Sequence, residues 1–531
     1  MTGQQQTEFL EALQNPAIYD HPAHSIELIE THISWVVLTG PYAYKIKKPV
    51  NLGFADFSTL EKRHHFCLEE LRLNRRLAPS LYQEVVSFCG TPRKPELNGT
   101  GPPFEYAVKM VQFPPEARLD HLLPRQRLRP SHIDQLARDV AEFHSRITVA
   151  APDSPWGKPE EIHIHARDNF TILLQLVEDN EKKARIEQVA KWSDTCYRHL
   201  RESMLERRRK GYIRECHGDM HLANMVLLHD RVTIFDCIEF NPSLRWIDIV
   251  NELAFVVMDL EYRGRADLAF RFLNRQLEYS GDYTGLLLLD YYRVYRAMVR
   301  AKVAGIRISQ CDTPSHCATA SETELRSYLS LAERYSGRNR NRPRLYITHG
   351  FSGSGKTWHT QPFLERLGAI RIRSDIERKR LFGLTPEGRS DSRLNKGIYT
   401  PQTSRRVYQR LEELANTILS AGFSVIVDAT FLKRRQREPF RRLAEQRQLP
   451  FTILDFHADI PTLRARIDAR SREGRDASEA TLKVLDQQLA SAEPLDTAEL
   501  SCSIHIDAWR SSIPLPAGIG NDRWEPSGQE S

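Results

Sequence analysis

Apolar and polar residues alternate along several short runs in the first part of the chain. Turn residues such as Thr39-Gly40-Pro41 bound these runs, and a two-residue repeat is typical of strands with one buried face. Residues 1–30 look helical and polar instead. Ser58 and Glu61 have the spacing of a capping box, so a helix is expected to begin there. The predicted strands lie at 35–38, 42–47, 85–88 and 104–111.

Apolar positions follow a helical repeat over much of 131–335. Predicted helical regions lie at 131–146, 168–209, 246–258 and 286–298. The stretch 217–239 between them differs, because polar residues in a fixed order precede two short β-type runs. The runs flank a three-residue break, His229-Asp230-Arg231, which predicts a hairpin.

Buried-type strands alternate with helical stretches in the last third of the chain, as in a parallel α/β sheet. A polar, basic stretch without periodicity precedes them and has the character of a linker. The tail is rich in Gly, Pro and polar residues and is predicted to be disordered. The expected strands lie at 345–349, 369–373, 424–427 and 451–456. The predicted organisation is a first domain at 1–335, a linker at 336–343, a second domain at 344–512 and a tail at 513–531.

Composition supports more than one folded domain. A chain of 531 residues is too long for one ordinary core. Hydrophobic residues make up 40% and charged residues 27%, as in soluble globular proteins. The net charge of +6 is mild and fits phosphate-bearing ligands, but it does not by itself indicate nucleic acid.

Cysteine usage and the lack of targeting segments predict a cytoplasmic protein. The eight cysteines form no C-x-x-C pair, and Cys311, His316 and Cys317 match no standard zinc spacing. Scattered cysteines are typical of a reducing compartment. No signal peptide is evident at the start, and no apolar run approaches the roughly 18 residues that span a membrane. We expect no membrane partner.

The polar stretch before the predicted hairpin has the residues of a phosphotransferase site. Asp219, Asn224 and Asp236 can converge at one end of the hairpin. Two acids and an amide suit a hydroxyl proton and Mg²⁺, which prefers oxygen ligands. In a kinase catalytic loop such residues are the base and the metal ligands. The alternative is a loop with a helix cap and two turn acids.

A lysine on an earlier strand is a candidate for binding ATP. Lys45 and Lys47 share one face of the strand 42–47, and kinases use such a strand lysine on the α- and β-phosphates. A solvated basic edge is the alternative. Glu70 is our choice as the ion-pair partner of Lys45, with Glu69 close behind, because the sequence does not phase a helix to within one residue.

The strand at 345–349 runs into Gly350-Phe351-Ser352-Gly353-Ser354-Gly355-Lys356-Thr357, which satisfies the P-loop pattern in its strand–loop–helix context. Glycines let backbone N–H groups surround phosphates at a helix N-terminus. Lys356 is expected to bind the β- and γ-phosphates, and Thr357 to bind Mg²⁺.

Acids and arginines after the P-loop complete this candidate site. Asp375 and Asp428 follow or end predicted parallel strands, and such positions face the nucleotide crevice. Asp428 is therefore a predicted Mg²⁺ acid, and Asp375 a predicted base for an acceptor hydroxyl; each could instead cap a helix. Arg466 and Arg470 lie four apart on one helix face. They are either a lid over the transferring phosphate or a solvated face.

Two family resemblances follow from these motifs. His217-Gly218-Asp219-x-His221-x-x-Asn224 with Ile234-Phe235-Asp236-x-x-Glu239 resembles the aminoglycoside phosphotransferase and choline kinase group, over roughly 30–335. This resemblance implies a protein-kinase-like two-lobed fold, with Asp219 as base, Asn224 and Asp236 as Mg²⁺ ligands and Lys45 on ATP. The sequence departs from the family in its short Thr39-Gly40-Pro41 turn and in Cys237.

The second half resembles small P-loop kinases of the polynucleotide kinase, zeta-toxin and gluconate kinase type. The resemblance rests on the P-loop, Ser374-Asp375-x-x-Arg378, Val427-Asp428-Ala429-Thr430 and the Arg466/Arg470 segment that leads to Ser478. It implies that Asp375 is the acceptor base, that Arg378 binds the acceptor and that Arg466 and Arg470 form a lid.

Together these patterns predict an α/β and α+β protein with two ATP- and Mg²⁺-dependent kinase-type domains. The expected partners are small molecules with a hydroxyl group, whose identity the sequence leaves open. One alternative is that one half is a sensor or a nucleotide-hydrolysing switch for the other. Another is that the P-loop half phosphorylates nucleic-acid ends, although the aromatic interleaving of single-strand platforms is absent from the sequence.

Overall fold

The computed structural model describes residues 2–53, 55–311, 316–337, 342–388, 390, 397–473, 478–507 and 513. The chain divides into two compact units. The first unit consists of Met1–Gln135, Glu142–Glu161 and Leu205–Val256, and the second unit of Leu136–Ala141, Ile162–Met204 and Val257–Ser531. The predicted linker lies inside the second unit, and its residues 338–341 are outside the described ranges. The predicted domain boundaries therefore stay a prediction.

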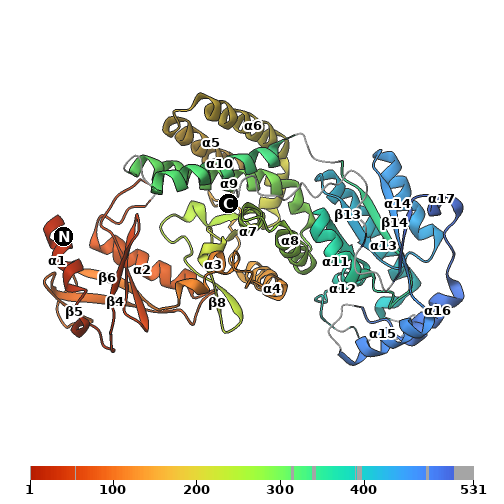
Figure 1. Ribbon diagram of the computed structural model, residues 1–531, viewed down its shortest axis with the longest axis horizontal. Helices are drawn as coiled ribbons and strands as arrows, with labels where there is room; N and C mark the ends of the chain where they lie inside the picture. Colours follow the sequence, from red (N-terminus) through yellow and green to blue (C-terminus); the bar gives the residue numbers. More distant parts are fainter. Residues whose placement is uncertain are drawn as a thin grey trace. The chain divides into compact units, whose positions relative to one another are not determined.

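A six-stranded antiparallel sheet forms the core of the first unit. Its strand order is β1-β2-β3-β6-β4-β5. Alternation in β3 places Tyr44 and Ile46 in a core with Phe9 and Phe88. Helix α2 lies beside β4 and β6 (Figure 1). The bounds are α1 (Gly3–Ala12), β1 (Glu27–Glu30), β2 (Ser34–Leu38), β3 (Tyr42–Lys47), α2 (Leu60–Asn74), β4 (Tyr82–Thr91), β5 (Lys94–Leu97) and β6 (Glu105–Val111).

Three local expectations for this region were wrong. Residues 1–30 contain strand β1 as well as a helix, and β5 forms a hairpin with β4 that the sequence did not reveal. Helix α2 is capped by Thr59, whose hydroxyl accepts from the Lys62 N–H at 3.3 Å. Ser58 donates its hydroxyl to Asp56 at 2.6 Å instead, so it is not available as the cap.

The predicted hairpin is present, with a tighter turn than expected. Strands β8 and β9 pair from Met225↔Ile234 to Leu228↔Arg231, so only His229 and Asp230 form the turn. Both residues have positive φ, as the two central residues of a type I′ turn require. Arg231 therefore belongs to the strand. The surrounding elements are β7 (Ile213–Glu215), the short helix η3 (Leu222–Asn224), β8 (Met225–Leu228), β9 (Arg231–Ile234) and β10 (Trp246–Asp248).

Helices make up most of the chain between the two sheets. The region 168–209, expected to be one long helical region, holds two helices, because Asp179 accepts the N–H groups of Glu181 and Lys182 and starts the second. The helices are α3 (Leu119–Leu122), α4 (Pro130–Arg146), α5 (Pro159–Leu176), α6 (Asn180–Arg209), α7 (Ile249–Tyr262), α8 (Ala266–Ser280), α9 (Leu286–Gln310) and α10 (His316–Ser336).

Two observations bear on the predicted compartment. Cys311 and Cys317 are joined by a disulfide, which differs from the expectation of reduced cysteines. Among the helices in the described ranges, none combines the length and apolar character needed to cross a lipid bilayer.

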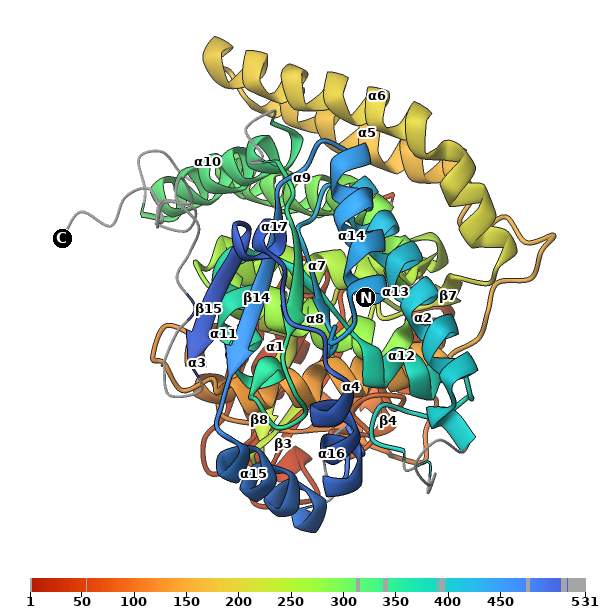
Figure 2. The same cartoon turned by 90° about the vertical axis from the view of Figure 1, so that its right-hand side faces the viewer.

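A five-stranded, fully parallel sheet forms the core after residue 344, with the order β12-β13-β11-β14-β15. Figure 2 shows β14 and β15 side by side. Tyr346, Ile426 and Leu454 pack on Phe363 and Leu364 of α11. The bounds are β11 (Leu345–His349), α11 (Lys356–Leu367), β12 (Ile370–Arg373), α12 (Ser374–Arg380), α13 (Pro401–Ser420), β13 (Val425–Asp428), α14 (Arg434–Gln446), β14 (Phe451–His457), α15 (Ile460–Glu473), α16 (Leu482–Ser491), α17 (Thr497–Leu500) and β15 (Ser503–Asp507).

The predicted mixed fold class is confirmed: an antiparallel sheet with its helical region precedes a parallel α/β sheet. The predicted disordered tail at 513–531 was wrong at its first residue, because Ile513 is buried in the core that contains Tyr346. The rest of the tail lies outside the described residues.

We predict that Arg437→Met destabilises the parallel-sheet domain by about 3–5 kcal/mol, the range for breaking a buried ion pair. Arg437 is buried in α14 and donates to both carboxylate oxygens of Glu499, at 2.7 and 2.9 Å. Its loss leaves a buried acid without this partner. Urea unfolding of the full chain, followed by tryptophan fluorescence, measures the change.

Arg441→Met is the matched control, because Arg441 forms an exposed ion pair with Glu445 in the same helix. Such surface pairs contribute about 0–1 kcal/mol. Equal midpoints for Arg437→Met and Arg441→Met would contradict the importance of the buried pair.

Candidate active sites

The predicted base Asp219 is held by two neighbours in the loop that precedes the hairpin. The Asn224 amide donates to the Asp219 carboxylate at 2.9 Å and to its backbone carbonyl at 3.0 Å. His221 Nε2 lies 3.3 Å from the same carboxylate oxygen. These two contacts orient the Asp219 carboxylate. The side chain is 35% exposed, so it is also accessible to a ligand.

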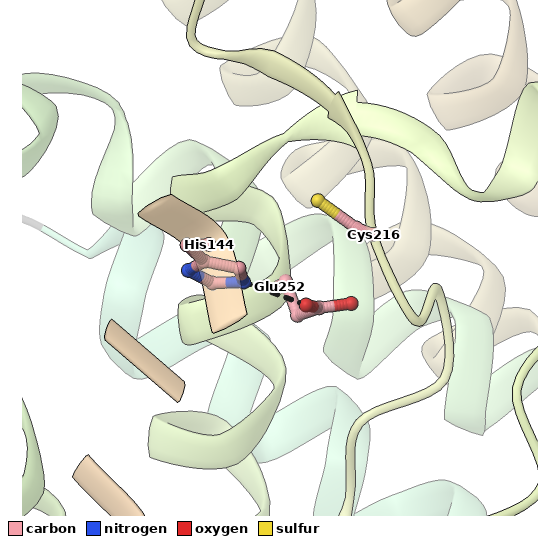
Figure 3. Close-up of side chains that lie close together, drawn as sticks. All are labelled: His144, Cys216 and Glu252. Atoms are coloured by element: carbon pink, nitrogen blue, oxygen red, sulfur yellow. Dashed lines mark hydrogen bonds and ion pairs between the residues drawn. The ribbon is translucent and has the colours of Figure 1, made fainter. Parts of the chain in front are cut away.

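The backbone of this loop is anchored by a buried acid from α7. One oxygen of Glu252 accepts the N–H groups of His217 and Gly218, each at 2.7 Å. The other oxygen lies 2.7 Å from His144 Nε2. Figure 3 shows His144 and Glu252 in contact, with Cys216 beside them. Burial alone would raise the pKa of Glu252, but His144, His217 and the Gly218 N–H hold it below its ordinary value. Glu252 therefore acts as an ionised anchor for the loop.

Asp236 is tied to the same loop through the backbone. His217 Nε2 donates to the carbonyl of Phe235 at 2.9 Å, and the Phe235 N–H donates to the carbonyl of Asn224 at 3.0 Å. Burial lowers the pKa of His217 below its ordinary value. Asp236 has a positive φ of 64°, a strained backbone for a non-glycine residue that often marks functional sites. The predicted metal ligands Asn224 and Asp236 are thus brought to one end of the hairpin.

Lys45 meets its predicted partner Glu70 and also the predicted metal ligand Asp236. Its ammonium group lies 2.8 Å from Glu70 and also contacts Asp236. Burial alone would lower the pKa of Lys45, but Asp236 and Glu70 raise it well above its ordinary value. Glu69 pairs with Arg72 instead, at 2.9 Å, so the structure selects Glu70 from the two candidates. Lys45 is therefore charged and lies between the helix acid and the predicted metal acid.

A second lysine joins this cluster, and the sequence did not assign it a role. Lys47 is completely buried, lies 2.7 Å from Glu70 and contacts Glu239. Glu70 thus bridges two strand lysines. The alternative of a solvated basic edge is wrong for Lys47, because it has no solvent exposure.

Two backbone N–H groups of the turn at Gly40 donate to other groups of the protein. The Thr39 N–H donates to the carbonyl of Tyr42 at 2.9 Å, which closes the turn. The Gly40 N–H donates to the side chain of Gln112 at 2.9 Å. These two backbone donors are already engaged, in keeping with the departure from the family pattern.

Glycine is required at two positions of the P-loop. A Cβ atom at Gly350 would lie 2.6 Å from the carbonyl oxygen of Phe456, and one at Gly353 would lie 2.9 Å from that of Leu463. Positive φ at both residues reinforces this requirement. Gln488 of α16 contacts both the N–H and the hydroxyl of Ser352, each at 3.0 Å. The loop is therefore held in one shape by the strands and helices around it.

Lys356 points back into the loop. Its ammonium group donates to the carbonyls of Gly350 and Phe351, at 2.9 and 2.7 Å, and lies 3.4 Å from the hydroxyl of Ser354. Burial lowers the pKa of Lys356 to about 8, against the opposing effect of Asp428 and Asp375.

The predicted Mg²⁺ ligands of the P-loop half are in direct contact. The Thr357 hydroxyl donates to Asp428 at 2.6 Å. Asp428 is the last residue of β13 and is paired in register with Arg373 of β12, whose Nε lies 3.9 Å from the Asp428 carboxylate. Hydroxyl and carboxylate oxygens are donors that suit Mg²⁺.

A cavity of about 910 Å³ joins most of the predicted P-loop residues. It is lined by Ser352, Gly353, Gly355, Lys356, Thr357, Asp375, Arg378, Asp428, Arg466 and Arg470, among others. Asp375 lies in the first turn of α12, directly after β12. Gly350 and Ser354 support the loop from behind through their contacts with Lys356.

Other groups of the protein hold Arg378, the predicted acceptor-binding residue, and the predicted lid residues Arg466 and Arg470. Arg378 donates to the carbonyl of Ile398 at 3.2 Å and lies over the ring of Tyr399. Arg466 donates to the carbonyl of Gly353 at 3.4 Å, and Arg470 to that of Ala480 at the same distance. Both lid candidates therefore lie beside the P-loop cavity rather than on a fully solvated face.

The site residues to which the sequence assigned no role share one property. Lys47, Glu239 and Glu252 are charged groups that are buried in the structure. For Glu252 a signal existed, because it directly precedes the apolar stretch Leu253-Ala-Phe-Val-Val-Met258 and an acid requires a partner once buried. The identity of that partner depends on contacts from distant parts of the chain.

Comparison with known proteins confirms the P-loop half. A family described as an AAA domain matches residues 345–495. A protein of Mycobacterium tuberculosis, described as uncharacterised, is 29% identical over 494 residues, which cover 92% of this chain and 96% of that protein. The similarity therefore includes both halves of the chain.

Solved structures give two further likenesses. A choline/ethanolamine kinase family protein from Mesorhizobium loti is 11% identical, covering 62% of this chain and 98% of that one, with a TM-score of 0.39. A gluconokinase from Sinorhizobium meliloti is 21% identical, covering 32% of this chain and 86% of that one, with a TM-score of 0.23. The match to the AAA-domain family covers residues 345–495, the part of the chain that contains the P-loop.

Proposed function

We propose that the protein is an ATP-dependent phosphotransferase with two sites, one around Lys356 and one around Asp219. The observation that carries this proposal is the P-loop cavity. There the hydrogen-bonded pair Thr357–Asp428 lies with Lys356 and the candidate base Asp375. This combination of phosphate donors, metal ligands and a base is what transfer to a hydroxyl group requires.

In the P-loop site each side chain has a distinct task. The loop N–H groups and Lys356 bind the phosphates, and Asp375 accepts the proton of the acceptor hydroxyl. Arg466 and Arg470 stabilise the charge that develops on the transferring group. Thr357 and Asp428 hold Mg²⁺, which when bound neutralises phosphate charge. Arg378 binds the acceptor.

In the first unit, Asp219 accepts the proton of a second acceptor, and Asn224 keeps its carboxylate in position. Asn224 and Asp236 offer the oxygen ligands that fit Mg²⁺. Lys45 binds ATP phosphates, and Glu70 holds it in place. Glu252 supports this site by fixing the backbone of His217 and Gly218.

Small molecules with a hydroxyl group are the acceptors that we propose. The P-loop cavity of about 910 Å³ falls within the size range of small-ligand pockets, about 300–1,000 Å³. It accommodates a nucleotide phosphate chain with a compact acceptor.

A second candidate function applies to the first unit alone. It is a small-molecule sensor without transfer chemistry. The closed turn at Gly40 favours this candidate, because its N–H already donates to Gln112. The ordered set Asp219, Asn224 and Asp236 favours transfer. Nucleotide binding by this unit distinguishes the two.

We predict that Lys356→Ala lowers the ATP turnover of the P-loop site at least about 100-fold, because removal of one charge-stabilising donor typically costs that much. The measurement uses the full chain carrying Asp219→Asn, so that the remaining turnover comes from the P-loop site. Arg366→Ala is the control, since Arg366 is an exposed cation on the same helix, α11. Unchanged turnover in Lys356→Ala would contradict the assignment.

We predict that Asp219→Asn abolishes transfer by the first unit but preserves its nucleotide binding. An asparagine oxygen still accepts the Asn224 amide, whereas the proton acceptor is lost. The full chain carrying Lys356→Ala is screened for ATP consumption with a set of hydroxyl metabolites, and thermal stabilisation by ATP with Mg²⁺ reports binding. If ATP gives no stabilisation in the Lys356→Ala chain, the sensor function replaces transfer for this unit.

A further inference from the structure

Helix α8 precedes the predicted linker, yet it covers the edge of the P-loop sheet. Strand β12 is the last strand at one side of that sheet. The Asn274 side chain donates to the carbonyl of Ala369 at 2.9 Å and accepts the N–H of Arg371 at 2.7 Å. An edge strand exposes such unpaired backbone groups, and here a side-chain amide satisfies two of them. Figure 1 shows α8 beside α11.

One turn further along α8, Glu278 is buried among two arginines of strand β12 and one arginine of its own helix. Only 1% of its surface is exposed. Its carboxylate lies 3.3 Å from Arg371, 4.0 Å from Arg373 and 2.7 Å from Arg275. Burial alone would raise the pKa of Glu278, but these arginines, Arg373 first, hold it below its ordinary value. Glu278 is therefore an ionised acid that balances buried positive charge.

The two β12 arginines lead directly to the predicted magnesium ligands. Arg371 donates to the backbone carbonyl of Thr357 at 2.9 Å. Arg373 lies 3.9 Å from the carboxylate of Asp428. Each member of the Thr357–Asp428 pair is thus contacted by an arginine that also contacts Glu278.

We infer that Glu278 is a positioning residue of the P-loop site and that α8 thereby sets the magnesium affinity of that site. Arg373 lies between two acids, Glu278 and Asp428. With Glu278 in place, the positive charge of Arg373 is shared between the two carboxylates. The Asp428 carboxylate therefore stays available to a metal ion. Without Glu278, Arg373 pairs more strongly with Asp428 and competes with Mg²⁺ for it. This inference rests on the proposed ATP- and Mg²⁺-dependent function of the P-loop site.

A consequence concerns the extent of the P-loop module. A fragment that starts after residue 336 lacks Asn274 and Glu278. It lacks the Asn274 side chain that bonds to the β12 edge and the Glu278 carboxylate that contacts Arg371 and Arg373. Tests of this site therefore require the full chain.

The test compares Glu278→Gln with the parent protein in two measurements. One is the magnesium dependence of ATP turnover. The other needs no catalysis and is the magnesium concentration for half-maximal thermal stabilisation by a non-hydrolysable ATP analogue, which is expected to rise by the same factor. Both proteins are full chains that carry Asp219→Asn, and the turnover counted is the part that Lys356→Ala removes. Glu278→Gln is expected to raise the magnesium concentration for half-maximal turnover about tenfold, the lower end of the effect of losing an outer-shell partner. The maximal rate at saturating magnesium is expected to change less than threefold. A general loss of structure would lower the maximal rate instead.

Glu365→Gln is the matched control. Glu365 of α11 pairs with Arg271 of α8 at 2.9 Å, so it belongs to the same helix contact. It contacts neither Arg371 nor Arg373 in the ion pairs described. Its magnesium dependence is expected to match that of the parent protein.

A double variant, Glu278→Gln with Arg373→Gln, keeps the inference testable if the single variant does not fold. It removes the competing cation together with the acid, so the charge balance is kept. Its magnesium requirement is expected to return to within about threefold of the parent value. A double variant that retains the full tenfold increase would overturn the role of Arg373.

Two further results would overturn the inference while leaving the proposed function intact. One is an unchanged magnesium dependence in Glu278→Gln. The other is an equal shift in Glu278→Gln and Glu365→Gln, which would make the effect a general property of the helix contact. If the parent protein shows no turnover that Lys356→Ala removes, the proposed function of the P-loop site falls, and the inference falls with it.

Discussion

Both candidate sites depend on buried carboxylates that are kept ionised by the groups around them. Transfer of a charged carboxylate out of water is costly unless cations or N–H donors compensate for it. Glu70 meets two lysines, Glu252 meets two backbone N–H groups and a histidine, and Glu278 meets three arginines. None of these acids is a predicted proton acceptor or metal ligand. Each instead holds a group that lies next to such a residue: Lys45 beside Asp236, the backbone that precedes Asp219, and Arg373 beside Asp428.

The residues expected to touch substrate could be predicted because their spacing is local. The P-loop runs within eight residues, and the glycines at 350 and 353 are required by contacts that any strand–loop–helix of this kind makes. Asp219 and Asn224 lie five residues apart in one loop. Asp236 reaches the same place because the hairpin returns the chain to its starting point. Glu70 could also be predicted in part, since helical spacing reduced the candidate partners of Lys45 to Glu70 and Glu69.

The supporting residues could not be predicted, because their partners are distant in sequence. Lys47 and Glu239 are separated by 192 positions in the sequence, and Glu278 and Arg371 by 93 positions. Alternation placed Lys47 on the face of Lys45 but could not say that this face would be buried. In the same way, no role was predicted for residues 266–280, where α8 lies between two predicted helical regions. Only the folded chain reveals that its polar face meets a strand edge.

The position of α8 gives a physical reason for the continuity of the two halves. Without α8, strand β12 would present free backbone groups at the sheet edge, and the buried Arg371 and Arg373 would lose the carboxylate of Glu278. Asn274 and Glu278 supply both needs from a segment that precedes the predicted linker. The P-loop domain is therefore structurally incomplete without part of the preceding half. This explains the fusion without requiring that the two candidate reactions be linked, because the stability of one sheet edge is enough to keep the segments in one chain.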